Sequence, residues 1–191
     1  MPKKNEAPVT VSQTLTEQDY GLATAAVRYF AAPMRRRSMR AAVCLTVAAL
    51  AAAFLPMCEQ NPNAHTAMVV VVILFAAAAI AICLFQPIAE RKSAAGWFHS
   101  CPLAALPATV TVSSDCAVVE NECERMTEYW TDFTLCVETE RLIAAAGGQE
   151  RYLFVVKKDG LQKEEAERLS NLMRYAFDGR WYRLPPRKGG K

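Results

Sequence analysis

Two stretches without a charged residue decide the architecture of this chain: AAVCLTVAALAAAFLPM (Ala41–Met57) and AMVVVVILFAAAAIAICLF (Ala67–Phe85). A helix needs about 20 mainly apolar residues to cross the roughly 30 Å hydrocarbon core of a bilayer. The segment between the stretches, CEQNPNAHT (Cys58–Thr66), is short and rich in Asn. The pattern therefore predicts two membrane-spanning helices that form an antiparallel hairpin. About 40 residues precede the first span and a second span follows it, which argues against a cleaved signal peptide.

The Lys and Arg residues around the hairpin predict its orientation, because cytoplasmic flanks of spanning helices carry an excess of these residues. Basic residues precede the first span and follow the second, whereas the loop between the spans contains neither Lys nor Arg. We therefore expect a multi-pass protein of the cytoplasmic membrane with both termini in the cytoplasm. The candidate contacts with the membrane surface are Arg35, Arg36, Arg37, Arg40, Arg91, Lys92 and Trp97.

Outside the hairpin the composition is that of an ordinary soluble domain. Hydrophobic residues make up 52% and charged residues 21% of the 191 residues, and these averages combine the two spans with the rest. Residues 1–40 hold seven Lys/Arg against three Asp/Glu, while residues 90–191 hold 15 of each. Because nucleic-acid binding usually needs a basic domain, we expect no nucleic-acid partner.

The segment before the hairpin predicts a short strand over residues 8–15 and then a helix that begins near Glu17. The helix has an apolar face, since its apolar residues recur at spacings of three and four: Tyr20, Ala23, Val27, Phe30 and Met34. Two placements are open at this point. The helix lies in the headgroup region of the membrane with its arginines toward anionic lipid, or it packs on the cytoplasmic domain.

Short alternating runs after residue 108 are typical of antiparallel strands. The expected strands are 109–113, 116–119, 124–130, 132–139, 141–146 and 150–157. Lys163–Phe177 then predicts an amphipathic helix, with glutamates near its N-terminus that complement the helix dipole. The expected fold class is an α+β membrane protein: a two-helix transmembrane hairpin followed by an antiparallel sheet that a C-terminal helix caps.

These patterns divide the chain into seven expected parts. They are a cytoplasmic N-terminal strand and helix (1–40), the first span (41–58), an extracytoplasmic loop (59–66), the second span (67–87), a connector (88–107), a cytoplasmic domain (108–179) and a basic tail (180–191).

Three short motifs in the C-terminal half resemble a known family. They are Tyr129-Trp130-Thr131-Asp132-Phe133, then Val137-Glu138-Thr139, and the strand end Val155-Val156-Lys157-Lys158, followed by the Glu-rich helix. With them, most of residues 10–180 resemble the YcxB-like bacterial membrane proteins. The resemblance implies a pleckstrin-homology-like (PH-like) domain over 108–179, with a bent seven-stranded sheet capped by a helix. It implies no activity, and Val156 stands where a Pro is common in that family.

The sequence gives little support for an enzyme. His65 and His99 are the only histidines, and the cysteine spacings do not match the paired CxxC units of zinc sites. His99-Ser100-Cys101 is compatible with a nucleophile–base pair or with metal ligands, but a surface His beside a small apolar Cys explains it more simply. We therefore expect no catalytic residue, no cofactor and no metal.

Acidic residues in the expected hairpin of strands 116–119 and 124–130 are candidates for partner binding. Glu120, Glu122, Glu124 and Glu128 alternate, so a strand would place them on one face, which is either a site for a basic partner or an ordinary solvated face. Trp130 and Asp132 are either a core residue and a turn cap or a binding pair. The candidates for partner binding are Glu122, Glu124, Glu128, Trp130 and Asp132.

The function expected from the sequence is that of a membrane-anchored, non-enzymatic interaction module that contacts the lipid bilayer and binds a protein partner. The alternative is a small regulatory or assembly subunit that acts through its membrane helices. Alanine-rich surfaces in both spans, at Ala48, Ala49, Ala52, Ala53 and Ala76–Ala79, permit the close helix packing that this alternative needs.

Overall fold

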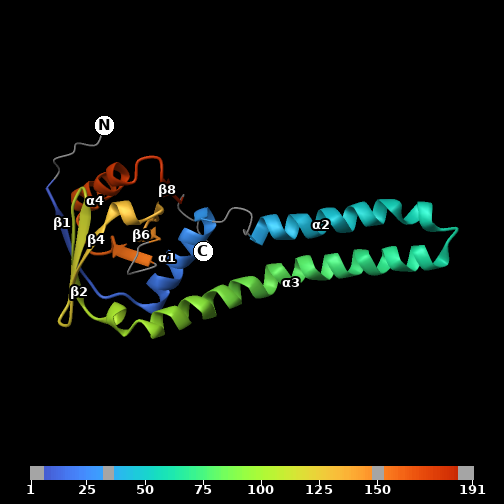
Figure 1. Ribbon diagram of the computed structural model, residues 1–191, viewed down its shortest axis with the longest axis horizontal. Helices are drawn as coiled ribbons and strands as arrows, with labels where there is room; N and C mark the ends of the chain where they lie inside the picture. Colours follow the sequence, from blue (N-terminus) through green and yellow to red (C-terminus); the bar gives the residue numbers. More distant parts are fainter. Residues whose placement is uncertain (1–6, 32–36, 148–152, 185–191) are drawn as a thin grey trace. The chain divides into compact units, whose positions relative to one another are not determined.

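The computed structural model describes residues 7–31, 37–147 and 153–184. For Arg37, Pro87 and Arg91 it describes the backbone alone. The chain divides into two compact units (Figure 1). One unit, Ala32–Lys92, contains an apolar hairpin of helices. The other combines Met1–Ala31 with Ser93–Lys191 and is an α+β domain.

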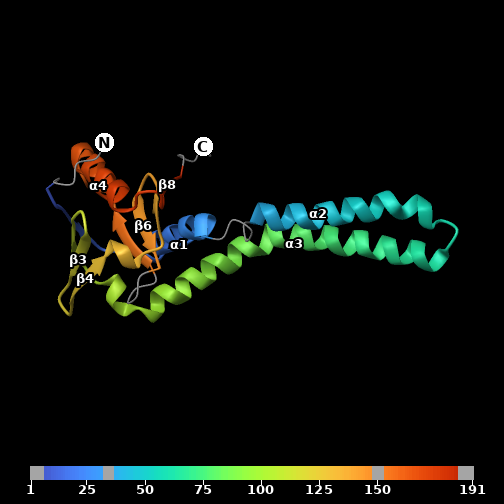
Figure 2. The same ribbon diagram turned by 45° about the horizontal axis from the view of Figure 1, so that its top comes forward.

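Helices α2 (Arg37–Phe54) and α3 (Pro62–Ser100) form the hairpin, with the short 3-10 helix η2 (Leu55–Cys58) before the turn. Both are long and apolar enough to cross a membrane, and they run side by side in Figures 1 and 2. The residues buried along the hairpin are small: Ala41, Ala48, Ala51 and Ala79. Small residues let helix backbones approach closely, so alanine explains the tight pairing.

Helix α3 is longer than the sequence predicts at both ends. It begins at Pro62, inside the expected loop, because Asn61 Oδ1 accepts hydrogen bonds from the N–H groups of Asn63 (3.2 Å) and Ala64 (3.3 Å) and thereby caps the helix. It continues to Ser100, through much of the expected connector. Charged residues from Glu90 onward end the apolar stretch but not the helix, since Glu, Arg, Lys and Ala are all good helix formers.

The first sheet of the domain combines segments from both sides of the hairpin. Its strands run antiparallel in the order β1 (Val9–Gln13), β2 (Ala108–Val112), β3 (Cys116–Glu120) and β4 (Arg125–Tyr129). In the β1–β2 pair, Val9 lies opposite Val112 and Val11 opposite Val110. Strand β1, which the sequence assigned to a region of its own over 1–40, is therefore a strand of the domain itself.

The second sheet contains β5 (Leu135–Glu138), β6 (Leu142–Ala146), β7 (Leu153–Lys157) and β8 (Trp181–Arg183), in the order β7-β6-β5-β8. The first three are antiparallel, and β8 pairs with β5 in parallel. The observed second sheet differs from the expected strands at two places. A 3-10 turn, η4 (Trp130–Asp132), occupies the start of the strand expected over 132–139, and β8 lies in the expected tail.

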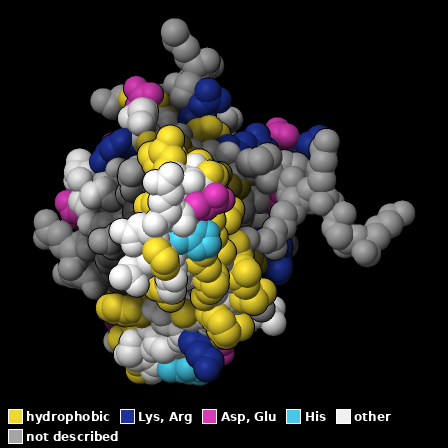
Figure 3. Space-filling view, turned by 90° about the vertical axis from the view of Figure 1, so that its right-hand side faces the viewer, with side chains coloured by type: hydrophobic (Ala, Val, Ile, Leu, Met, Phe, Trp, Pro, Cys, Tyr) yellow, Lys and Arg dark blue, Asp and Glu magenta, His cyan; other side chains and the backbone are white. Residues whose placement is uncertain are grey.

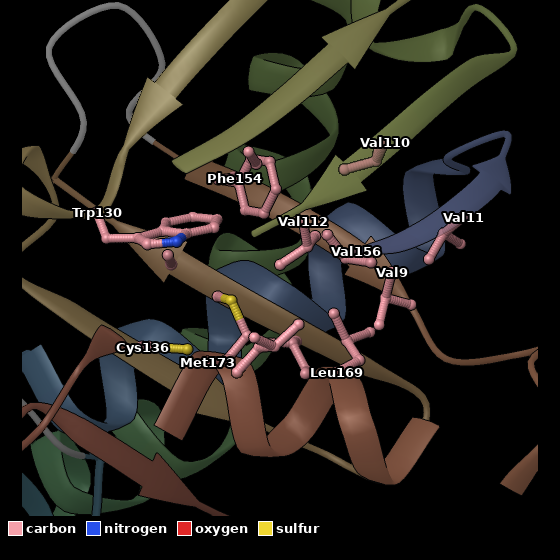
Figure 4. Packing of buried hydrophobic residues seen from close by; sticks show 14 of the residues in the cluster. Val9, Val11, Val110, Val112, Trp130, Cys136, Phe154, Val156, Leu169 and Met173 are labelled. Carbon is pink, nitrogen blue, oxygen red and sulfur yellow. The ribbon is translucent and has the colours of Figure 1, made fainter. Parts of the chain in front are cut away.

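The main core lies between the two sheets, and helix α4 (Lys163–Ala176) covers it. Gln162 and Glu165 form a capping box at the start of α4. Figure 4 shows Leu169 and Met173 reaching from α4 toward the valines of β1, β2 and β7. The helix predicted over 163–177 and its apolar face are therefore confirmed.

Helix α1 (Glu17–Ala31) settles the two placements that the sequence left open, because it packs on the domain. Its apolar face, including Ala23, Ala26 and Val27, lies against the side of the second sheet that faces away from the main core. That sheet is consequently covered on both sides. Met34, which completed the predicted helix face, lies outside the described residues.

Candidate functional site

A shallow polar groove of about 600 Å³ lies where β1 ends, β2 begins and β3 turns into β4. Its lining consists of Ser12, Gln13, Thr14, Pro107, Ala108, Thr109, Glu120, Asn121 and Glu122. Two carboxylates, two threonine hydroxyls and one serine hydroxyl give this groove a negative and hydrogen-bonding character. Of the predicted partner-binding residues, Glu122 lines this polar groove.

The β3–β4 turn holds the acidic part of the groove in place. Asn121 Oδ1 accepts hydrogen bonds from the backbone N–H groups of Cys123 and Glu124, both at 2.8 Å. An Asn side chain that bonds two residues ahead in this way stabilises a tight turn. Glu124 is half-buried, and its Oε1 accepts a hydrogen bond from Asn121 Nδ2 at 3.5 Å, so this carboxylate supports the turn.

The expectation that four glutamates share one strand face is wrong, because Glu128 points the other way. Its side chain is 4% exposed, and it lies opposite the fully buried Ala117 in the β3–β4 register. The alternation along β4 places Met126 and Glu128 on the inner side and Thr127 and Tyr129 outside. An acidic surface thus consists of Glu120 and Glu122, without Glu128.

Trp130 is a core residue. Its ring is 2% exposed and packs against Phe133, Phe154 and Phe177, with centroid distances of 5.3–6.0 Å. Its indole N–H donates to the carbonyl oxygen of Ser113 at 2.9 Å. Asp132 is half-buried in the 3-10 turn and accepts a hydrogen bond from Thr131 at 3.3 Å. Trp130 therefore has the core role that was one of its two interpretations, and a role of Asp132 in capping the turn or in binding stays a prediction.

A second hollow, an apolar cavity of about 250 Å³, adjoins the polar groove and shares Gln13, Ala108 and Asn121 with it. Side chains of the strands line one side, and the end of α3 together with the 3-10 helix η3 (Pro102–Ala105) closes the other. The apolar lining consists of Leu15, Tyr20, Trp97, Leu103, Ala104, Leu106, Ala108, Val110, Val119, Leu153, Phe154 and Val155. Ser100, Cys101, Gln13 and Asn121 complete it.

Gln13 joins the two sheets beside this apolar cavity. Its Nε2 donates to the carbonyl oxygen of Val155 at 2.8 Å, and its Oε1 accepts from the N–H of Lys157 at 2.7 Å. Both polar atoms of the amide are therefore used within the protein. The amide of Asn121 is likewise hydrogen-bonded within the turn. The amides of both residues that line the cavity therefore already have partners in the protein.

Two buried ion pairs hold the helices on the second sheet. Lys157 Nζ lies 3.0 Å from Asp19 Oδ2 and links α1 to β7. Lys158 Nζ lies 2.6 Å from Glu138 Oε1, which also accepts a hydrogen bond from Ser170 of α4 at 2.8 Å. Both carboxylates are less than 5% exposed.

The environment of Asp19 determines its protonation. Burial by itself would raise the pKa of Asp19, but hydrogen bonds from Lys157 and Thr16 and the charge of Lys157 together lower that pKa below its usual 3.8. The ionised form is therefore the one that the fold stabilises, and the α1–sheet contact is electrostatic as well as apolar.

The thiols differ in chemical character. Cys136 is fully buried, and burial together with the nearby charge of Glu138 raises the pKa of its thiol. Such a thiol is unreactive in the folded protein. Cys101 and Cys123 are exposed. Among the described residues, no three His, Cys, Asp or Glu side chains lie close enough to hold a metal ion.

The predicted membrane-surface residues fall into three groups. Arg40, Lys92 and Trp97 are exposed. Arg37 and Arg91 belong to α2 and α3 by their backbone, and Arg35 and Arg36 lie outside the described residues. In the expected basic tail, Arg180 donates from Nη1 to the carbonyl oxygen of Phe133 at 2.6 Å. Residues 185–191 lie outside the described ranges.

Sequence reasoning missed Gln13 and the residues of the apolar cavity. The alternation PVTVSQTL did indicate a strand at β1, but no local signal shows that this strand pairs with β2 or that Gln13 reaches β7. In the sequence, Leu103 and Leu106 of the connector are only apolar residues between two prolines, with no pattern that indicates a cavity. A run of apolar residues after a long helix was the one available signal.

No family model, curated protein or solved structure matches this chain.

Proposed function

We propose that this protein is a membrane-anchored, non-enzymatic interaction module of the YcxB-like type, in which the α+β domain is PH-like and binds a protein partner on the cytoplasmic side. The observation that carries the proposal is the insertion of the apolar hairpin between two neighbouring strands of one sheet. Because β1 precedes the hairpin and β2 follows it, the two flanks of the hairpin must lie on the same side of any membrane that it crosses.

The composition of the hairpin surface supports insertion. Large apolar side chains are more than half exposed along both helices, among them Val43, Leu50, Ile73, Leu74, Ile80 and Phe85. Figure 3, a view from the end at which the hairpin turns, shows hydrophobic side chains covering much of this surface. In water such a surface is unfavourable by about 25 cal/mol per Å² of apolar area, and a bilayer removes this cost.

The PH-like description rests on the arrangement of the domain. Two sheets face each other across one core, and a C-terminal helix covers the core at one side. This arrangement supports the family resemblance, although the described residues form two four-stranded sheets, with β8 in the second, where the resemblance implies one bent sheet of seven strands. The polar groove is the proposed partner surface, since strand β3 places Glu120 there, the hydrogen-bonded β3–β4 turn places Glu122 there, and both suit a partner with basic side chains.

Cysteine labelling tests the topology. In one variant Cys58, at the turn of the hairpin, is the only cysteine, and in a matched variant only Cys123 of the β3–β4 turn remains. A membrane-impermeant maleimide should label Cys58 only from outside intact cells and Cys123 only in inside-out vesicles. Labelling of both from the same side, or release of the protein by alkaline carbonate, would contradict the proposal.

Photo-crosslinking in cells tests the partner surface. A photoreactive amino acid replaces Thr109, which lines the polar groove, in the full-length protein. We expect a discrete crosslinked product that disappears when Glu120 and Glu122 are both changed to Lys. The matched control changes two exposed glutamates of α4, Glu164 and Glu167, to Lys and should leave the product unchanged. Equal loss in both double variants would show that net charge, rather than this groove, attracts the partner.

The alternative, a regulatory or assembly subunit, draws support from one feature of α2. Ala48 is buried against the hairpin, whereas Ala49, Ala52 and Ala53 are exposed. These three small residues are not used in packing the hairpin itself, so they remain open to another membrane helix. Crosslinks from Ala52 to a second membrane protein, combined with none from Thr109, would favour this alternative.

A further inference from the structure

We propose that the apolar cavity beside η3 binds a single hydrocarbon chain of an amphiphile, such as an acyl chain. The proposal does not depend on the partner-binding role suggested above, because all lining residues belong to the α+β domain and the acidic residues of the polar groove, Glu120 and Glu122, do not line the cavity. Three properties of the cavity point to this ligand: its size, its chemistry and its opening.

The size suits one slender chain. A dry apolar cavity of about 150 Å³ accepts benzene, whereas pockets for drug-sized molecules measure about 300–1,000 Å³. The cavity here, at about 250 Å³, lies between these limits. An empty cavity of this volume is therefore costly for the fold. The same volume is too small for a bulky ring system.

The chemistry of the lining favours hydrocarbon over a polar molecule. The walls are formed by leucines, valines, alanines and aromatic rings, and no Asp, Glu, Lys or Arg is among the described lining residues. Gln13 bonds the backbone of β7 with both of its amide atoms, and Asn121 bonds the β3–β4 turn. A polar ligand would lose its hydrogen bonds to water and find few replacements in the lining, which disfavours its binding.

The opening is suited to an amphiphile whose polar end stays in solvent. Trp97 is 58% exposed and Leu103 is 36% exposed, although both line the cavity. Their apolar surfaces are thus partly in solvent, and a bound chain would cover them. At the other side the cavity meets the polar groove at Ala108 and Asn121. Glu120 and Glu122 line that groove and disfavour an anionic head group, so a neutral amphiphile is the appropriate probe.

The test uses the full-length protein in phosphatidylcholine nanodiscs and two probes without net charge that carry the same chain-terminal diazirine. One is a monoacylglycerol with a 12-carbon chain, which samples free amphiphile, and the other is a phosphatidylcholine within the disc, which samples bilayer lipid. After irradiation, adducts are mapped by mass spectrometry. We expect adducts on cavity residues such as Leu103, Val110 and Leu153. The probe that produces them identifies the source of the chain.

Two adjacent alanines of η3 give a matched pair of variants. Ala104 lines the cavity, whereas Ala105 is exposed and does not line it. Ala104→Leu should fill the cavity and reduce the mapped adducts at least fivefold, while Ala105→Leu should leave them unchanged. Ala108→Leu, at the start of β2, provides a second filling variant should Ala104→Leu disturb the turn.

A second measurement is independent of these variants. Trp97 fluorescence should be quenched by a monoacylglycerol brominated at the chain end, at concentrations below its micelle formation, and this saturable quenching should be absent in Trp97→Phe. The proposal is overturned if neither diazirine probe modifies cavity residues, or if folded Ala104→Leu and Ala108→Leu proteins are modified as strongly as the unaltered protein.

Discussion

The two sheets of the domain bury their residues in different ways. In the first sheet each strand alternates, so that Val9 and Val11 of β1 face the core while Thr10 and Ser12 face solvent. In the second sheet all residues of β5 and β6 are buried. The cause is helix α1, which covers the side of the second sheet that would otherwise face water. One added helix thus changes which residues a strand can tolerate on its outer face.

Buried charges should give the largest contrast between the sheets. In β6, Ala144 faces α1 and Ala145 faces the main core, so Asp at either position should lower the free energy of unfolding by several kcal/mol. In β1, Val11→Asp should lower the free energy of unfolding as much. Thr10→Asp, on the solvated face, should change that free energy by less than about 0.5 kcal/mol. Urea unfolding of the full chain in nanodiscs, followed by tryptophan fluorescence, measures this. A mild effect of Ala144→Asp would show that α1 does not seal the outer face.

Removal of the central aromatic ring should have the next largest effect. Trp130→Ala should lower the free energy of unfolding by about 3–5 kcal/mol, because it opens a cavity among Phe133, Phe154 and Phe177. The reporter is the reaction of Cys136 with a thiol reagent in a background without the other cysteines, since this buried thiol reacts only on opening. Thr131→Ala, one position further along and exposed, is the control. Unchanged stability together with loss of a crosslinked partner would instead assign Trp130 to binding.

The electrostatic contact of α1 should show a distinct pH dependence. Because the pKa of Asp19 is lower in the folded protein, its carboxylate adds stability that is present above about pH 4 and is lost as pH falls through the folded-state pKa. Asp19→Asn should therefore cost about 1–3 kcal/mol at pH 7, with the difference from the unaltered protein shrinking below about pH 4. Asp159→Asn, which affects an exposed pair with Arg141, should cost less than about 1 kcal/mol. Equal effects of Asp19→Asn at pH 3.5 and pH 7 would rule out this linkage.

The smallest effects are expected at two glycines, with opposite signs. Gly147 ends β6 with φ at +98°, and an added Cβ would lie 2.8 Å from Thr134 Oγ1, so Gly147→Ala should destabilise by about 1–2 kcal/mol. Gly21 lies within α1 with nothing within 4 Å of an added Cβ, so Gly21→Ala should stabilise by about 0.5–1 kcal/mol. Thermal unfolding of the two variants side by side distinguishes them. A stabilising Gly147→Ala would mean that the β6 end adopts another conformation.

Strands of both sheets could be predicted from the sequence, and β8 is the exception among the described strands. Strands β2, β3 and β4 were found because one-sided burial leaves an alternation that a local pattern reveals. Strand β8 was missed because Trp181–Arg183 becomes a strand only by pairing with Cys136–Glu138. The candidate site shows the same limit. Glu122 was correctly placed on the surface, but the burial of Glu128 depends on its register opposite Ala117.

By itself, the sequence determined the apolar hairpin, the α+β class and the amphipathic helix predicted over 163–177, because each depends on local composition or on a period that one segment carries. Only the tertiary structure decided that the domain begins before the hairpin, since Thr10 and Thr111 meet across 101 positions of the chain. It also decided that α1 covers the second sheet and that η3 closes an apolar cavity. These features depend on which surfaces meet, and contacts between distant segments leave no periodic trace in either segment alone.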